Sequence, residues 1–208
     1  MKIVSSLLGI VKRYFFPGSA LYWEKRYTSN GNSGAGSYGA SAAYKADILN
    51  KFIVDQGVKS AVEFGCGDGN QLTLLNFTSY VGFDVSNTII KKCRLKFKGD
   101  EGKRFYEYSS FNTLPETSLY VSDVALSLDV VYHLVEDHVY EDYMKSLFSS
   151  STRFVIIYAW DVEGEKNLHV KHRKFTDWIR QNITNFSLKI HLPSDKGYCD
   201  FVIYEKIS

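Results

Sequence analysis

The sequence of 208 residues predicts an α/β fold, in which helices cover both faces of a sheet of mostly parallel strands. Three observations predict it. Short apolar runs typical of strands alternate with segments of helical periodicity, a glycine-rich loop follows the first run, and two strand-like segments close the chain as a hairpin. Such sheets bind their ligands where the strands end, at the carboxyl side.

The chain is long enough for one well-filled domain with a small appendage. We expect residues 1–54 to form an N-terminal helical and glycine-rich segment, and residues 55–208 to form the globular unit. The apolar stretch in residues 1–16 is too short to span a bilayer, and no small-residue cleavage site follows it. It is either a helix packed on the domain or a weak surface anchor with Lys12 and Arg13 at headgroup level.

Residues 29–39 are rich in glycine and serine, which indicates a loop. Two interpretations stay open. The segment is a plain linker, or it is a lid that closes over a bound ligand and excludes water. In the second case we expect Tyr27 and Tyr38, which flank the loop, to contact the ligand.

Local patterns place the remaining elements. Strands are expected at residues 60–62, 80–83, 104–108, 121–128, 154–158, 186–191 and 198–205, and helices at residues 40–56, 86–97, 139–148 and 175–183. Residues 71–77, directly after the glycine-rich loop, also show helical periodicity. We therefore expect the loop to lead into a helix whose positive end faces the ligand.

The glycine-rich loop runs from Glu63 to Asn70 with the sequence Glu-Phe-Gly-Cys-Gly-Asp-Gly-Asn. A dinucleotide-binding loop has glycine at the first, third and sixth positions of its fingerprint, which are Gly65, Gly67 and Asn70 here. Asn70 breaks the pattern. Glu63 would repel a pyrophosphate but would suit a cationic ligand, so the loop favours a ligand that carries positive charge and no phosphate.

A second acid, Asp84, ends the next apolar run about twenty residues after the loop begins. A carboxylate at that place accepts hydrogen bonds from both ribose hydroxyls of an adenosine. S-adenosylmethionine is such an adenosine, and it carries a sulfonium and an amino group without phosphate. The sequence therefore suits this methyl donor better than NAD.

With the E-x-G-x-G-x-G pattern of residues 63–69 and Asp84 after it, the chain resembles the class I S-adenosylmethionine-dependent methyltransferases. The resemblance covers residues 55–208 in architecture, and its specific motifs lie between residues 63 and 133. It implies a Rossmann-like sheet of seven strands in the order 3-2-1-4-5-7-6, with strand 7 antiparallel.

The resemblance also implies further cofactor contacts. We expect them at Cys66 in the loop, at Val85 after the second acid and at Leu128 where the fourth strand ends. In many relatives an acid near the end of the third strand binds the adenine amino group. The corresponding stretch here offers Ser110, which we expect to accept that hydrogen bond, and Phe111, which we expect to stack on the base.

A hydroxyl acceptor needs a base, because its oxygen is a poor nucleophile until the proton begins to leave. His133, just beyond the fourth strand, is the candidate base, since histidine titrates near working pH. Asp129 is the alternative, either as the base or as the group that orients His133. The competing interpretation is a histidine that caps or packs the following helix.

A second polar cluster follows the fifth strand. We expect His169, His172 and Arg173 to bind an acceptor that bears phosphate or carboxylate, because a guanidinium holds such groups with two parallel hydrogen bonds. Tyr132 is expected to contact the same acceptor. A solvated basic run is the alternative. The two histidines lack an acidic partner at a suitable spacing, so we expect no metal site.

Segments such as S-L-D-V-V-Y-H-L-V-E-D and H-V-K-H-R-K-F also resemble small methyltransferases associated with surface-glycan assembly. This likeness implies O-methylation of a saccharide, either a sugar nucleotide or a surface glycan. Other acceptors (a protein side chain, a small amine or RNA) and a non-catalytic donor-binding module stay open.

The composition of the chain limits the kinds of partner and the compartment that we expect. The net charge of +2 gives no general attraction to nucleic acid, so we do not expect a nucleic-acid partner. The three cysteines are scattered, which suits a reducing cytoplasm and not a disulfide framework. Whether the chain forms a homodimer, and whether it lies at the membrane periphery, stays open.

Overall fold

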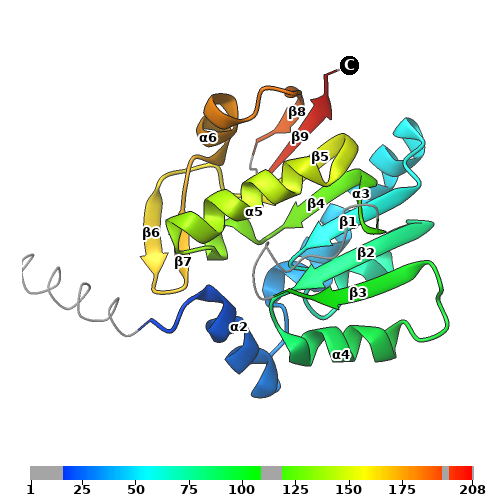
Figure 1. Ribbon diagram of the computed structural model, residues 1–208, viewed down its shortest axis with the longest axis vertical. Helices are drawn as coiled ribbons and strands as arrows, with labels where there is room; N and C mark the ends of the chain where they lie inside the picture. The colour runs from blue at the N-terminus through cyan, green and yellow to red at the C-terminus, as the bar shows by residue number, and fades with distance from the viewer. Residues whose placement is uncertain (1–15, 109–118, 194–196, 208) are drawn as a thin grey trace, which may run out of the picture.

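The computed structural model describes residues 16–108, 119–193 and 197–207. The main sheet has seven strands in the order β3-β2-β1-β4-β5-β9-β8 (Figure 1). The strands are β1 (Ser60–Phe64), β2 (Ser79–Asp84), β3 (Lys103–Glu107), β4 (Ser122–Leu128), β5 (Ser151–Ala159), β8 (Phe186–Leu192) and β9 (Asp200–Lys206). The first five are parallel, and β9 runs antiparallel to its neighbours β5 and β8. This confirms the predicted order, with β8 and β9 as the sixth and seventh strands.

Helices cover both faces of the sheet, as predicted (Figure 1). The helices are α2 (Ser19–Thr28), α3 (Gly39–Gln56), α4 (Asn87–Lys96), α5 (Asp137–Ser149) and α6 (Phe175–Asn182). α3 and α4 pack on one face and α5 and α6 on the other. Side chains alternate between the faces along each strand, so that Ala61 joins the first core and Val62 the second. The domain boundary expected at residue 54 falls inside α3, whose buried side joins the sheet core.

The helix predicted after the glycine-rich loop is wrong. Residues 71–77 contain only a 3₁₀ turn, Gln71–Leu74, because the chain must reach the start of β2 at Ser79 within a few residues. The side chain of Asn50 in α3 contacts this connection between β1 and β2 twice. It donates to the Leu74 carbonyl at 2.8 Å and accepts from the Asn76 amide at 3.0 Å. α3 therefore covers the face that the missing helix would have covered, and the loop has no helix end beside it.

The basic run after the fifth strand is ordered. β6 (Gly164–Asn167) and β7 (Val170–His172) form a separate antiparallel hairpin next to α2 (Figure 1). Val170 and His172 are buried, whereas Lys171 between them is partly exposed, as strand alternation requires. The run is thus one side of a hairpin and not a solvated loop.

None of the helices in the described ranges is long and apolar enough to cross a bilayer. Residues 1–15 lie outside the described residues, so the membrane contact expected of segment 1–16 stays a prediction.

One buried hydroxyl connects α5 to the sheet. The Tyr143 hydroxyl lies 2.9 Å from the carbonyl oxygen of Phe64, the last residue of β1, and 2.7 Å from the Ser127 hydroxyl in β4. We predict that Tyr143→Phe lowers the free energy of unfolding by about 1–3 kcal/mol, because a buried carbonyl loses its donor. Urea unfolding measures the change. Tyr106→Phe is the matched control, since no hydrogen bond of the Tyr106 hydroxyl to a described residue is present. Equal losses of unfolding free energy in the two variants would contradict a stabilising role for the Tyr143 hydroxyl.

Candidate functional site

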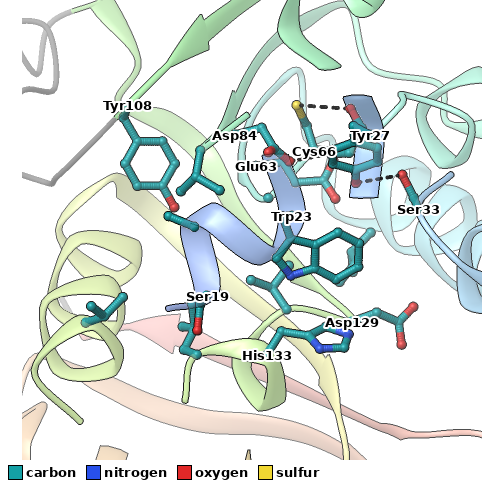
Figure 2. A pocket seen from close by; sticks show the side chains of 18 of the residues that line it. Ser19, Trp23, Tyr27, Ser33, Glu63, Cys66, Asp84, Tyr108, Asp129 and His133 are labelled. Atoms are coloured by element: carbon teal, nitrogen blue, oxygen red, sulfur yellow. Dashed lines mark hydrogen bonds between the residues drawn. The ribbon is translucent and has the colours of Figure 1, made fainter. Parts of the chain in front are cut away.

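A cavity of about 450 Å³ lies where β1, β2 and β4 end, within the usual size of small-molecule sites. Figure 2 shows Tyr108, which follows β3, at one end of the cavity, and Ser33 and Asp129 toward the other. Trp23 of α2 lies across the middle. Side chains from the N-terminal segment and from the strand ends therefore enclose the cavity together.

The glycine-rich loop is fastened to β2 by its own amides. The Gly65 and Cys66 N–H groups donate to the Phe83 carbonyl at 2.7 and 2.9 Å, and the Gly67 N–H donates to Asp84 at 3.0 Å. The next amides, of residues 68 to 70, also donate to protein oxygens. Because these donors are occupied, the loop offers no row of free amides to a phosphate.

The loop's glycines are required by close packing. Gly65, Gly67 and Gly69 have φ of 86°, 55° and 67°, which disfavours other residues. A Cβ on Gly67 would also lie 2.3 Å from the Ser33 hydroxyl, and one on Gly65 would lie 2.6 Å from the Val130 side chain. The loop thus fits closely between the N-terminal segment and the end of β4.

Two buried carboxylates face the cavity. Glu63 accepts a hydrogen bond from the Tyr80 hydroxyl, and its burial raises the carboxyl pKa to about 7. Asp84 accepts from the amides of Gly67 and Ser86, both at 3.0 Å, while burial raises its pKa to about 6. Neither charge is fully compensated by the protein. A cation or a set of hydroxyl donors in the cavity would stabilise the ionised forms.

Beyond β4, Lys45 and Asp129 form a buried ion pair with Nζ 2.5 Å from Oδ2. Asp129 has φ of 62°, a conformation that most residues avoid. Its other oxygen accepts from the Tyr132 hydroxyl at 2.9 Å. A Cβ on Gly36 would lie 2.7 Å from the Asp129 carboxylate, so the glycine-serine loop packs directly on this pair.

His133 is half-buried in the cavity wall. Its Nδ1 lies 3.0 Å from the His169 carbonyl oxygen. Because a carbonyl only accepts, Nδ1 carries the proton and Nε2 is left as an acceptor. Burial lowers the pKa of His133 to about 4, so the ring is neutral at neutral pH and, contrary to the reason for choosing it as a base, does not titrate near working pH. The Trp23 ring packs edge-on against it at 4.9 Å between centroids.

The helix α2 lines the cavity and is held at its start and at its middle. At its start, the Ser19 hydroxyl donates to Glu136 at 2.6 Å. Further along, Glu24 accepts from the hydroxyl of Ser86, the N-cap of α4, and from the Thr88 hydroxyl at 2.6 Å. These contacts hold α2 over the cavity, whereas the lid role expected for residues 29–39 stays a prediction.

A smaller cavity of about 150 Å³ adjoins the first. Four residues line both cavities and so form the boundary between them: Trp23, Ser33, Asp129 and His133. Tyr132 and His169 line the smaller cavity on its far side.

No protein-family model matches the sequence, and no curated protein matches it either. Several solved structures do match the fold of the chain. The N-methyltransferase NodS from Bradyrhizobium japonicum superposes with a TM-score of 0.63 at 12% identity, over 80% of this chain and 96% of that chain. An S-adenosylmethionine-dependent methyltransferase from Clostridium acetobutylicum gives 0.61 at 11% identity, over 78% and 90%. Magnesium protoporphyrin IX methyltransferase from Synechocystis, crystallised with S-adenosylmethionine, gives 0.58 at 16% identity, over 79% of each chain.

The chain has the class I methyltransferase fold. The strand order and the glycine-rich loop after β1 agree with this assignment. None of the three structures is named for a glycan, so the expected link to surface-glycan assembly remains a proposal.

Most of the predicted cofactor residues lie together in this fold. Those that line the larger cavity are Tyr27, Glu63, Gly65, Cys66, Gly67, Asp84, Val85 and Leu128, together with the candidate catalytic residues Asp129 and His133. Tyr38 and Asn70 do not line it: the Tyr38 hydroxyl donates to Asp68 at 2.7 Å, and the Asn70 amide donates to the Ser37 carbonyl at 2.7 Å. Ser110 and Phe111 lie outside the described residues.

The predicted acceptor residues separate into two groups. Tyr132 and His169 line the smaller cavity, whereas His172 is buried, with its ring 5.6 Å from that of Tyr132. Arg173 binds the Asp137 carboxylate at 2.6 Å and the Leu134 carbonyl at 2.7 Å. Its guanidinium thus ties the end of the hairpin to the start of α5 and lines neither cavity.

The sequence analysis missed Lys45, Ser33 and Tyr108, which all line the larger cavity. Lys45 could have been found: it falls on the apolar stripe of α3, where a charge needs a buried partner. Ser33 carries no such signal within a glycine-serine loop. Tyr108 lies two positions before Ser110, within the uncertainty of where a strand ends.

The Lys45–Asp129 pair supplies a stability test. We predict that Lys45→Met destabilises the fold by about 3 kcal/mol, because it leaves a mostly buried carboxylate without its counter-charge. Lys45→Met combined with Asp129→Asn should lose less than the single variant. Urea unfolding measures both, with Lys51→Met as the control, since the exposed Lys51–Asp55 pair is worth only about 0–1 kcal/mol. If the loss of unfolding free energy in the double variant equalled the sum of the losses in the two single variants, the ion pair would contribute nothing to stability.

Proposed function

We propose that the protein is an S-adenosylmethionine-dependent methyltransferase of the EC 2.1.1 class that O-methylates a saccharide hydroxyl, with His133 as general base. One observation carries the proposal. A neutral histidine with an acceptor nitrogen lies between a larger cavity with two buried carboxylates and a smaller cavity with aromatic walls.

The larger cavity fits the donor by charge and by hydrogen bonding. Asp84 has oxygen lone pairs beyond those used by two backbone amides, which suits ribose hydroxyls. Glu63 and Asp84 together favour a positively charged ligand, and the occupied loop amides disfavour a phosphate. The Synechocystis protein of the same fold was crystallised with this donor, which supports the same choice here.

When bound, the donor supplies a methyl group on a sulfonium, ready for attack by a nucleophile. The acceptor oxygen forms the new bond to carbon while the carbon–sulfur bond breaks, and His133 Nε2 takes the hydroxyl proton. Trp23 and Tyr27 keep water from the reacting groups. Alignment supplies roughly 7–11 kcal/mol in favourable cases and a placed base roughly 10²–10⁴-fold in rate.

Asp129 is the weaker candidate for the base. Its carboxylate is bound to Lys45 on one oxygen and to Tyr132 on the other. These contacts engage both of its oxygens with other protein groups. They also fix the Tyr132 ring in the wall of the smaller cavity, which makes Asp129 a positioning residue.

The acceptor class is supported by the rings around the smaller cavity. Tyr22, Trp23, Tyr132 and His169 present aromatic faces or edges, on which a sugar ring packs well. Transfer of labelled methyl groups to a panel of sugar phosphates, sugar nucleotides, glycans, amines and peptides tests this choice. Labelling confined to amines or peptides would contradict O-methylation of a saccharide.

The proposed catalytic role of His133 can be tested by substitution. His133→Gln should lower kcat by about 10²–10⁴-fold, because no group then accepts the hydroxyl proton. The affinity for S-adenosylhomocysteine, measured by calorimetry, should stay within about twofold. His191→Gln on the exposed strand β8 is the matched control. Near-normal turnover of His133→Gln would remove this residue from the mechanism.

Donor binding should depend on pH. Glu63 and Asp84 have pKa values of about 7 and about 6, and a cationic donor favours their ionised forms. The affinity for S-adenosylmethionine should therefore be greatest near pH 7.5 and fall as the pH drops through 7 and 6 to 5.5. Calorimetry in buffers of different ionisation enthalpy should show proton release on binding near pH 6.5.

The variant Glu63→Gln provides the control for this profile, since it removes the step near pH 7 and leaves the step near pH 6. A flat profile in the wild-type protein would contradict the proposed charge complementarity.

A further inference from the structure

The smaller cavity continues to the surface along α2. Tyr22 and Arg26, which line it, also line a shallow groove with Lys25 and residues 29–32. The larger cavity, the smaller cavity and this groove therefore follow one another, with Trp23 and His133 at the first boundary and Arg26 at the second. The smaller cavity thus adjoins the surface groove on one side and the larger cavity on the other.

Arg26 is placed at the second boundary with much of its hydrogen-bonding capacity unused. Its Nε donates to the Asn32 carbonyl at 2.8 Å, and its Cζ lies 5.5 Å from the centre of the Trp23 ring. A Cβ on Gly34 would lie 3.9 Å from Nη2, so the end of the guanidinium lies beside the cavity wall. Among the described residues, no carboxylate lies within ion-pair distance of Arg26.

The groups around this guanidinium do not compete for an anion. The rings of Tyr22 and His169 are stacked with centroids 4.5 Å apart, and those of His169 and His133 with centroids 5.8 Å apart. Burial, and after it the charge of Arg26, lower the pKa of His169, so this ring is neutral at neutral pH. Arg26 is then the cation that faces the smaller cavity.

We propose that Arg26 binds a phosphate or carboxylate group of the acceptor, while the smaller cavity holds the hydroxyl-bearing ring against His133. The inference rests on the proposed function and names its substrate class. It also gives Arg26 the role that the sequence suggested for Arg173, whose guanidinium is occupied by Asp137 and backbone carbonyls.

The separation between His133 and Arg26 limits which acceptors can contact both residues. The Trp23 ring lies beside both groups: its centre is 4.9 Å from that of His133 and 5.5 Å from Arg26 Cζ. We therefore expect the acidic group and the reacting hydroxyl to belong to the same sugar unit or to directly bonded groups. Sugar phosphates, the sugar-proximal phosphate of sugar nucleotides, and uronic acids meet this requirement.

Calorimetry with three probes tests the inference. Glucose 1-phosphate, glucuronate and glucose are titrated into the full chain, with and without S-adenosylhomocysteine. We expect binding of at least one anionic sugar and none of glucose; binding of the phosphate alone or of the carboxylate alone identifies the acidic group. Arg26→Gln should weaken this binding by about tenfold or more, because a charge-assisted contact is lost.

Arg180→Gln is the matched control: it removes the same charge from the exposed face of α6, and its affinity for the anionic sugar should not change. S-adenosylhomocysteine should bind Arg26→Gln as it binds the wild-type protein. Equal binding of glucose and the anionic sugars, no binding of either anionic sugar, or an unchanged affinity in Arg26→Gln would overturn the inference. Failure of S-adenosylhomocysteine to bind the wild-type protein would instead overturn the proposed function.

Discussion

The attachment of the glycine-rich loop to β2 is the interaction on which the site depends. The Phe83 carbonyl accepts two loop amides, and Asp84 accepts a third from Gly67. These hydrogen bonds occupy the backbone amides that would otherwise attract an anion. They also bring Asp84 and Glu63 to the same cavity. The local field is therefore negative, although the whole chain carries a net charge of +2. For the proposed donor, the charges that line the cavity therefore matter more than the overall charge.

The N-terminal segment completes the site from outside the sheet. α2 brings Trp23 to the boundary between the cavities, and the loop after it packs on Asp129 through Gly36. The larger and the smaller cavity thus share one wall, made by this segment and by the residues just after β4. A change in the position of α2 would alter both cavities together, which couples exclusion of water to alignment of the acceptor.

Periodicity and motif spacing were enough to predict the sheet, the closing hairpin and the cavity residues Glu63, Asp84 and His133, because these depend on local sequence. The errors lie where distant residues decide. Asn50 of α3 hydrogen-bonds to the backbone within residues 71–77, where a helix was predicted. Asp137 of α5 forms an ion pair with Arg173, which was predicted to bind the acceptor. No pattern within either segment shows these partners. Lys45 is different, since a lysine on an apolar stripe signals a buried partner without naming it.

Two of the three bonds that join the loop to β2 run from backbone to backbone. Such bonds do not depend on side-chain identity, apart from the glycines that keep the chain close. Side chains elsewhere can therefore change while these bonds persist, which agrees with structural neighbours that share the fold at 11–16% identity.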